Sequence, residues 1–216
     1  MKESLTWLRL LILSLIVGLP AMPATLQASP LDDLLHDIET HSRRIETLRC
    51  RFTQERSLAM FQQPIRFHGR LALIRPDRLR WEFLSPVPSV LIFNGDRGLR
   101  CTDGSDPVEF NLATDPVMRM VAEQLWTWLK GDYAALRQSY AIKQSGPAAI
   151  TVTPVDQGTA DIIAAIDITF DDATFQPQSV TILEAGGDST RIDFSDYAFD
   201  TRLPEAMFTS CLPREE

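Results

Sequence analysis

The sequence predicts a mainly β fold with a helical lid (α+β), and three patterns support this prediction. Segments with apolar residues at every second position recur along the chain, which is typical of antiparallel strands with one apolar face. Two segments instead carry apolar residues at helical spacing, one before the strands and one between them. No internal repeat or low-complexity linker occurs, so we expect residues 29–216 to form one domain.

The first 28 residues have the pattern of a signal peptide. Lys2 and Arg9 precede an apolar run at residues 10–19, which is shorter than the roughly 20 residues that span a bilayer. Small residues follow, so we expect cleavage after Ala28, with Ala24 as the alternative. No cysteine lies near either position, so lipidation of a new N-terminus is not expected. We therefore predict a protein of the periplasm.

The first predicted helix covers residues 31–48. Ser29 is suited to cap it, and Pro30 fits its first turn. Its apolar residues lie on one face: Leu31, Leu34, Leu35, Ile38, Ile45 and Leu48. This face needs a partner surface.

Strands are predicted directly after this helix. The alternation begins at residues 50–55, continues through residues 65–73 and 78–83, and reaches residues 89–93 before a turn at residues 94–96. In the last of these strands Leu91 and Phe93 compete with Val90 and Ile92 for the inward face.

A helical insert interrupts the strands. Asp115 is suited to cap it and Pro116 to begin it, and a shorter helix is predicted at residues 133–138. The strands resume beyond Tyr140, at residues 148–153, 162–170, 179–184 and 190–194. Because a curved sheet must cover its apolar face, we expect it to wrap around these helices or around a ligand.

Composition excludes several functions. The chain has a formal net charge of −8, so a nucleic-acid partner and stable insertion in a membrane are not expected. Cys50, Cys101 and Cys211 allow one disulfide in any of three pairings, or three unpaired thiols, and the sequence does not choose between them. The absence of a Cys-x-x-Cys pair argues against a thiol oxidoreductase.

No pattern of catalytic residues appears. His36 and His41 are five positions apart, which is wrong for a helical metal pair, and no nucleophile elbow, zinc-protease motif or phosphate loop occurs. We predict that the protein is not an enzyme and uses no cofactor and no metal. The aromatic cluster of Trp126, Trp128 and Tyr133 suits either a partner surface or a helix that faces a cavity.

Several short motifs together resemble the LolA family of outer-membrane lipoprotein carriers. They span residues 31–211 and comprise Phe52-Thr53-Gln54, Gly69, Arg75-Pro76 with Leu79-Arg80-Trp81, Pro86, Asn94-Gly95, Tyr140-Ala141-Ile142-Lys143, Ile150-Thr151-Val152-Thr153-Pro154 and Met207-Phe208-Thr209. The resemblance implies a half-open β-barrel of about eleven strands with a helical lid over a hydrophobic cavity. It also implies a monomeric periplasmic chaperone in lipoprotein localization and outer membrane biogenesis, with an inner-membrane donor transporter and an outer-membrane acceptor.

The resemblance also indicates the residues of the site. An arginine in the position of Arg75 is similar to a latch that hydrogen-bonds the lid in the empty state. We expect the cavity to be lined by inward residues of the strands and helices: Leu34, Ile38, Phe52, Phe67, Leu71, Leu73, Trp81, Phe83, Leu91, Phe93, Val117, Met120, Val121 and Leu125.

Other functions remain open at this point. The family has a longer strand and loop after its Phe-Thr-Phe segment, whereas this sequence has Phe208-Thr209-Ser210-Cys211 and stops at Glu216. This difference and the aromatic insert favour a carrier for another amphiphile, such as a glycolipid or an aryl-lipid. A periplasmic scaffold with a filled core and, more remotely, a lipid hydrolase are the further alternatives.

Overall fold

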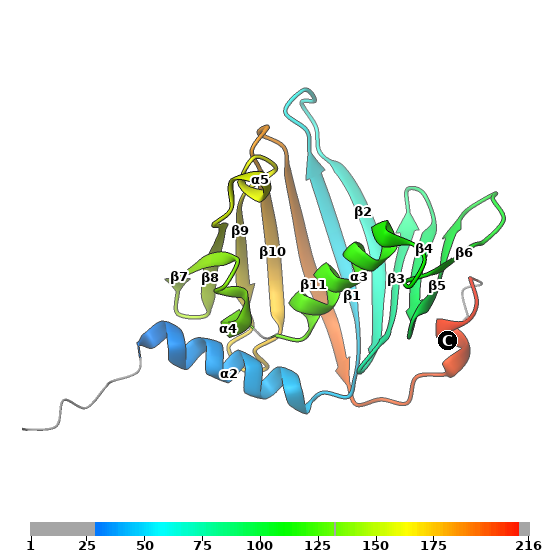
Figure 1. Cartoon of the computed structure of the whole chain (residues 1–216), viewed down its shortest axis with the longest axis horizontal. Helices are drawn as coiled ribbons and strands as arrows, with labels where there is room; N and C mark the ends of the chain where they lie inside the picture. Colours follow the sequence, from blue (N-terminus) through cyan, green and yellow to red (C-terminus); the bar gives the residue numbers. More distant parts are fainter. Residues whose placement is uncertain (1–28, 132, 212–216) are drawn as a thin grey trace, which may run out of the picture.

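The computed structural model describes residues 29–131 and 133–211, which form one curved, 11-stranded antiparallel sheet with helices on its concave side (Figure 1). The strand order is β6-β5-β4-β3-β2-β1-β11-β10-β9-β8-β7. Two meanders, β1 to β6 and β7 to β11, are therefore joined by the pairing of β1 with β11. The predicted fold class and the number of strands are confirmed, while the predicted signal peptide at residues 1–28 lies outside the described residues.

The strand bounds extend the sequence prediction at both ends of the insert. Beyond the predicted strands, the structure has β5 and β6 before the insert and β7 directly after it. The strands are β1 Thr47–Ser57, β2 Ile65–Ile74, β3 Arg78–Ser85, β4 Ser89–Asn94, β5 Arg97–Thr102, β6 Val108–Asn111, β7 Tyr140–Gly146, β8 Ala149–Pro154, β9 Ile163–Phe170, β10 Pro177–Glu184 and β11 Ser189–Phe199.

Both long helices begin at the predicted caps. The side chain of Ser29 accepts a hydrogen bond at the start of α2 (Pro30–Arg44), and that of Asp115 accepts two at the start of α3 (Pro116–Leu129). The shorter elements are α4 (Tyr133–Leu136), α5 (Gln157–Ala160) and the 3-10 helix η1 (Glu205–Phe208). No helix within residues 29–131 and 133–211 combines the length and apolar character that a bilayer crossing requires.

The predicted extension of the first helix to residue 48 is wrong. The helix ends at Arg44, Ile45 caps it in an extended conformation, and Leu48 belongs to β1. The strand prevails because β1 pairs with β2 on one side and with β11 on the other, which satisfies its backbone groups. Leu48 still faces the core, but from the sheet.

Each long helix covers a different meander: α2 covers the second meander and α3 covers the first. The apolar face of α2, with Leu34, Leu35 and Ile38, packs with α4 against β8 and β9. Helix α3 instead covers the first meander, where Met118 and Ala122 join the buried residues of β1 to β4. The C-terminal ends of the two helices come together, since Ser42 of α2 and Leu129 of α3 line one cavity.

The C-terminal segment, residues 203–211, covers the outer face of the first meander. Leu203 and Phe208 are buried against Val90 and Ile92 of β4. This packing resolves the competition within β4, because Leu91 and Phe93 belong to the cluster on the concave side. Both apolar sets of this strand have a partner, so strict alternation could not identify the inward set.

Two interactions hold the C-terminal segment in place. Cys101 of β5 and Cys211 form a disulfide, while Cys50 is a free, buried thiol. The buried guanidinium of Arg80 donates hydrogen bonds to three backbone carbonyls of the segment, those of residues 207, 210 and 211, and pairs with Glu82 at 3.1 Å. Arg70 also pairs with Glu82. We call this arrangement the C-terminal clamp.

Candidate functional site

A small cavity lies where α2, the end of α3 and the concave face of the sheet meet. Its volume is about 60 Å³, and its walls are mainly apolar. Ile38 contributes from α2, Leu71 and Leu73 from β2, and Phe194 from β11. A volume of this size holds only a few water molecules, so the cavity has no room for an acyl chain.

Arg75 closes this cavity from the turn between β2 and β3. Its Nε donates to the carbonyl oxygen of Ile45 at 3.0 Å, and its Nη2 donates to Ser42 Oγ at 3.1 Å and to the carbonyl oxygen of Leu129 at 2.8 Å. One side chain thus joins the sheet to the C-terminal ends of both α2 and α3. Burial lowers the pKa of the Arg75 guanidinium, which nevertheless stays charged because an arginine titrates far above neutral pH.

Gly131 allows the two helices to approach each other at this point. It follows α3 in the left-handed region, with φ of +70°, and a Cβ built on it would lie 2.7 Å from Ser42 Oγ. A larger residue would therefore push the end of α3 away from α2 and from Arg75.

Burial suppresses the ionisation of three groups in the cavity wall. Burial raises the pKa of the Cys50 thiol to about 12, so the reactive thiolate is absent near neutral pH. Burial also raises the pKa values of Tyr133 and Tyr197, and the Tyr197 hydroxyl donates to the carbonyl oxygen of Pro177 at 2.6 Å. These three groups are therefore neutral near pH 7.

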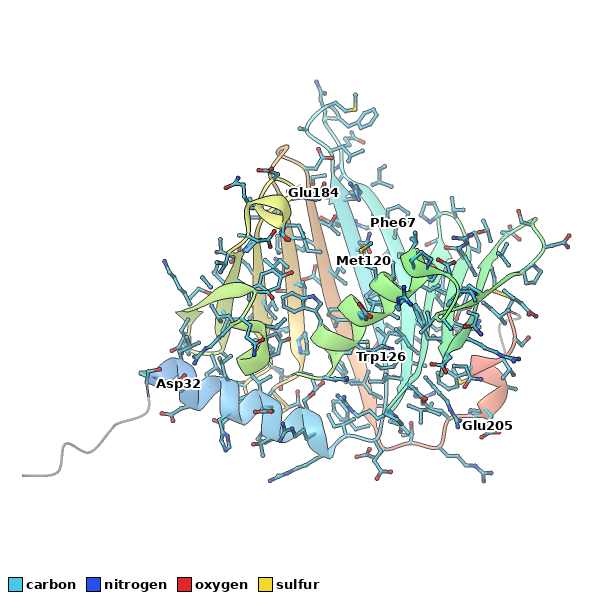
Figure 2. All side chains as sticks on the ribbon, viewed as in Figure 1. Asp32, Phe67, Met120, Trp126, Glu184 and Glu205 are labelled. Carbon is cyan, nitrogen blue, oxygen red and sulfur yellow. A yellow bond between two sulfur atoms is a disulfide. The ribbon has the colours of Figure 1, made fainter. Side chains whose placement is uncertain are left out.

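An aromatic row continues from the cavity along the concave face. Phe52 contacts the rings of Trp81, Phe83 and Phe194 at centroid distances of 5.3, 5.3 and 6.5 Å. Phe67 extends the row, at 5.7 Å from Phe83 (Figure 2). The Phe52 ring lies over Gly69 of β2, where an added Cβ would come within 2.2 Å of it. The Nε1 atom of Trp81 is buried and has no hydrogen-bond partner among the described residues.

The structure distributes the predicted cavity residues over three neighbouring places. Ile38, Leu71 and Leu73 line the cavity itself, and Leu34 lies beside it in the core under α2. Phe52, Phe67, Trp81 and Phe83 form the aromatic row. The remaining inward residues pack between α3 and the sheet, two from β4 and two from α3 itself: Leu91, Phe93, Val121 and Leu125.

Two predicted residues lie elsewhere. Val117 and Met120 of α3 are 62% and 58% exposed, and Figure 2 shows Met120 on this helix. Their places toward the sheet are taken by Met118 and Ala122. The helix carries apolar residues on more than one face, so its spacing alone could not identify the buried one.

Several cavity residues were missed by the sequence prediction. Leu48 and Cys50 alternate with Phe52 along β1, and this spacing could have indicated them once the end of the helix was known. Tyr133 is buried, and Trp128 contacts its ring, so these two members of the aromatic cluster face inward. The other missed residues come from the second meander and could be predicted only with knowledge of the sheet topology: Phe170, Phe175, Phe194 and Tyr197.

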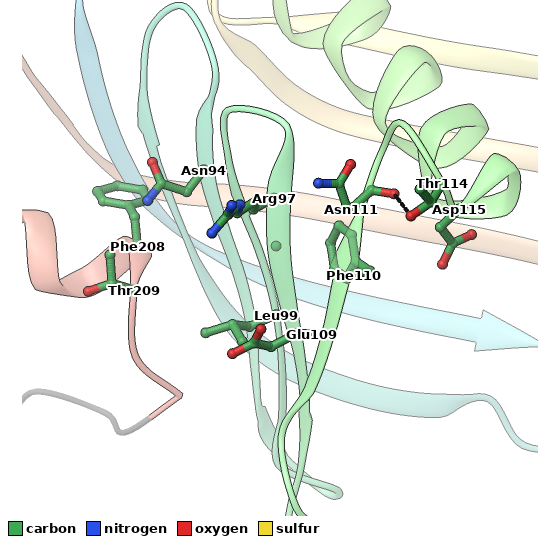
Figure 3. Close-up of a pocket in the computed structure, with 11 residues that line it drawn as sticks. Asn94, Arg97, Leu99, Glu109, Phe110, Asn111, Thr114, Asp115, Phe208 and Thr209 are labelled. Carbon is green, nitrogen blue, oxygen red and sulfur yellow. Dashed lines mark hydrogen bonds between the residues drawn. The ribbon is translucent and has the colours of Figure 1, made fainter.

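A second hollow, of about 700 Å³, lies at the open edge of the sheet (Figure 3). Arg97 of β5, Asn111 of β6 and Phe208 of η1 lie around it, and Thr114 donates a hydrogen bond to the backbone carbonyl of Asn111 at 3.3 Å. Its wall mixes charged, amide and apolar side chains on an open surface. It is therefore distinct in chemistry from the apolar cavity under Arg75.

The histidines do not form a metal site. His41 contacts the carbonyl oxygen of Asp37 and stacks on Phe175, while His36 is exposed. Within the part of the chain that the structure describes, no three His, Cys, Asp or Glu side chains are grouped to hold a metal ion.

The structure thus combines a curved antiparallel sheet with helices that cover its apolar concave face. The chain belongs to the LolA family: the family model described as outer membrane lipoprotein carrier protein LolA matches residues 43–211. Proteins of this family are carriers, and membership supports a role in carrying lipoproteins or lipids in general.

Individual proteins and solved structures are also similar to this chain. An outer-membrane lipoprotein carrier protein of Halorhodospira halophila is 27% identical over 214 residues, which cover 96% of this chain and 90% of the relative. A conserved protein from Thermus thermophilus has the same fold, with a TM-score of 0.54 and 13% identity over 87% of this chain and 96% of its own. A LolA superfamily protein from Nitrosomonas europaea aligns with a TM-score of 0.43 and 11% identity, over 85% and 99% of the two chains.

Proposed function

We propose that this protein is a periplasmic carrier that binds the acyl chains of lipoproteins and transfers them towards the outer membrane. The observation that carries the proposal is the position of Arg75. Its three hydrogen bonds hold both helices over an apolar surface, with a cavity of only about 60 Å³ between them. In this proposal residues 1–28 direct the chain out of the cytoplasm, and the protein has no catalytic activity.

The energetics explain why a carrier needs such a latch. Each buried methylene contributes about 0.8 kcal/mol, so a sixteen-carbon chain gains on the order of 10 kcal/mol when it leaves water. Such a chain would be hard to release from a permanently open groove. Closing the lid restores the Arg75 bonds, each of roughly 1.5 to 3 kcal/mol for a charged donor, and this opposes filling. The latch thereby makes loading reversible.

The proposal is tested by identifying and transferring the cargo. The protein is purified from the periplasm, its lipids are extracted, and mass spectrometry identifies them. We expect triacylated lipoprotein bound to the wild type. Arg75→Leu should retain this cargo but fail to pass it to outer-membrane vesicles, whereas Arg97→Leu, an exposed arginine at the sheet edge, should transfer normally. Equal transfer by the Arg75 variant and the wild type would contradict the latch.

A second cargo class is favoured by the aromatic row. The buried, unpartnered Nε1 of Trp81 can donate to an oxygen of a bound ligand, and the rings around Phe52 offer flat contact surface. A glycolipid or an aryl-lipid in the extract would identify this class instead. A protein that binds no lipid even after delipidation and reloading would indicate a scaffold with a filled core.

A further inference from the structure

The hairpin between β1 and β2 presents apolar side chains to solvent at its tip. In Figure 1 this hairpin extends beyond its neighbours, at the end of the sheet away from α2. Met60 is 83% exposed and Phe61 60% exposed, and Ile65 at the start of β2 is also exposed. These are large apolar residues without cover from any described element. We call residues 58–65 the hairpin tip.

The hairpin tip is uncharged within an acidic protein. It has the sequence Leu-Ala-Met-Phe-Gln-Gln-Pro-Ile, whereas charged residues make up 23% of the whole chain. The charges at its base are paired: Arg56 lies 3.3 Å from Glu184, and Arg66 forms an ion pair with Glu55. An apolar medium could therefore receive the tip without taking up an unpaired charge.

The base of the hairpin is anchored, so the tip is presented in a fixed direction. The backbone N–H of Ala59 donates to Asp188 Oδ1 at 2.8 Å, which ties the hairpin to the turn between β10 and β11. Within the turn, the N–H of Phe61 donates to the carbonyl oxygen of Leu58 at 2.8 Å. Met60 and Phe61 are thus exposed on a turn that hydrogen bonds hold in place.

The tip is continuous with the aromatic row. Ile65 and Phe67 lie two positions apart on β2 and so share one face of the strand. Phe67 contacts Phe83, and Phe83 contacts Phe52, whose neighbour Phe194 lines the cavity. Apolar side chains therefore follow one another from the exposed tip to the residues that Arg75 covers.

We propose that the hairpin tip inserts reversibly into the acyl layer of a lipid bilayer and aligns the aromatic row with it as the path for acyl chains. The proposal rests on the carrier function proposed above and adds the bilayer as a direct partner. The uncharged tip fits a zwitterionic surface, since the net charge of −8 repels anionic lipids. Insertion of one turn is weak, which suits a carrier that must leave again.

Vesicle flotation tests the contact with full-length mature protein and phosphatidylcholine vesicles. We expect the wild type to float with the vesicles, and Met60→Glu/Phe61→Glu to bind at least tenfold more weakly. Ala113→Glu/Ala173→Glu is the control, because it places the same charge on exposed turns at the opposite end of the strands and should bind like the wild type. Circular dichroism confirms that all three proteins are folded.

Transfer of a fluorescent acyl chain between two vesicle populations tests the path. The tip variant should transfer at least tenfold more slowly while it holds the same amount of acyl chain at equilibrium. Equal flotation and transfer by tip variant and wild type would overturn the proposal. Tip-dependent transfer only from vesicles that contain membrane proteins would also overturn it, in favour of a protein partner. If the wild type binds no acyl chain, the carrier function is refuted. The flotation result then still shows whether the hairpin tip binds the bilayer.

Discussion

Arg75 and Arg80 lie close together in the sequence but hold opposite faces of the sheet by different means. On the concave side, Arg75 bonds only neutral oxygens, those of Ser42, Ile45 and Leu129, and forms no ion pair among the described residues. On the outer side, Arg80 is paired with Glu82 and acts together with a disulfide. We therefore expect the concave cover to open more readily than the outer one.

The two arginines also differ in how their burial is compensated. Glu82 is buried, which alone would raise its pKa, but Arg80 and Arg70 outweigh this effect and hold its pKa below the ordinary value. Burial lowers the pKa of Arg75, whose hydrogen-bond acceptors are neutral oxygens rather than a carboxylate. A desolvated cation without a carboxylate gains solvation when the lid opens, and this offsets part of the cost of breaking its hydrogen bonds.

Removing Arg80 should have the largest effect on stability. Arg80→Ala leaves three carbonyls of the C-terminal segment without their donor and Glu82 with one cation, so we expect a loss of about 3 to 5 kcal/mol in the free energy of unfolding. Urea denaturation measures it. Arg78→Ala, on the same strand, removes only an exposed pair with Glu205 and should cost less than about 1 kcal/mol. Equal losses for the two variants would contradict the C-terminal clamp.

Removing the disulfide should have the next largest effect. Cys101→Ser/Cys211→Ser opens a loop with a sequence separation of 110 residues, and we expect a loss of about 2 to 4 kcal/mol. A reductant should destabilise the wild type by the same amount, because Cys50 takes no part in the bond. If the reductant destabilised the double variant as well, another pairing would have to be present.

Acid should weaken the C-terminal clamp by a smaller amount. Because the folded-state pKa of Glu82 lies below its ordinary value of 4.5, its contribution is fully present above that pH and is lost as the pH falls through the folded-state pKa. Stability of the wild type should therefore fall more steeply below about pH 4.5 than that of Glu82→Gln. Parallel pH profiles in thermal unfolding would show that Glu82 contributes nothing.

Removing Arg75 should have the smallest effect on stability and a large effect on opening. Arg75→Leu removes three hydrogen bonds but also the cost of burying a cation without a carboxylate, and because the two effects oppose each other we expect a change of less than about 1 kcal/mol in the free energy of unfolding. Cys50 lies in the cavity below and reports on the lid, since a maleimide reaches it only when the helices move. Its labelling rate should rise at least tenfold, whereas Arg97→Leu should leave the rate unchanged.

Local patterns predicted the elements of this fold better than they predicted its contacts. Ser29 and Asp115 were identified as caps because a cap depends on neighbours within one turn. The inward face of β4 was ambiguous because the C-terminal segment, far away in the sequence, covers its second face. In the same way, packing against distant strands determines that Met118 is buried and Met120 is exposed.

The site shows the same division. Arg75 and the front-half cavity residues Leu71 and Leu73 were predicted, since motif and alternation lie in one stretch of sequence. Cavity residues from the second meander, such as Phe170 and Phe194, were not predicted, because only the pairing of β1 with β11 brings them near.

That pairing has a consequence for how the chain folds. Each meander is built from neighbouring hairpins, but β1 must wait for β11, the last strand to be synthesised. Helix α2 is synthesised before either meander and yet packs against β8 and β9 of the second one. The acceptors of Arg75 therefore come together only after both halves have docked, so we expect the latch to be among the last contacts formed. A newly made chain would then pass through a stage in which its concave face is already built but still uncovered.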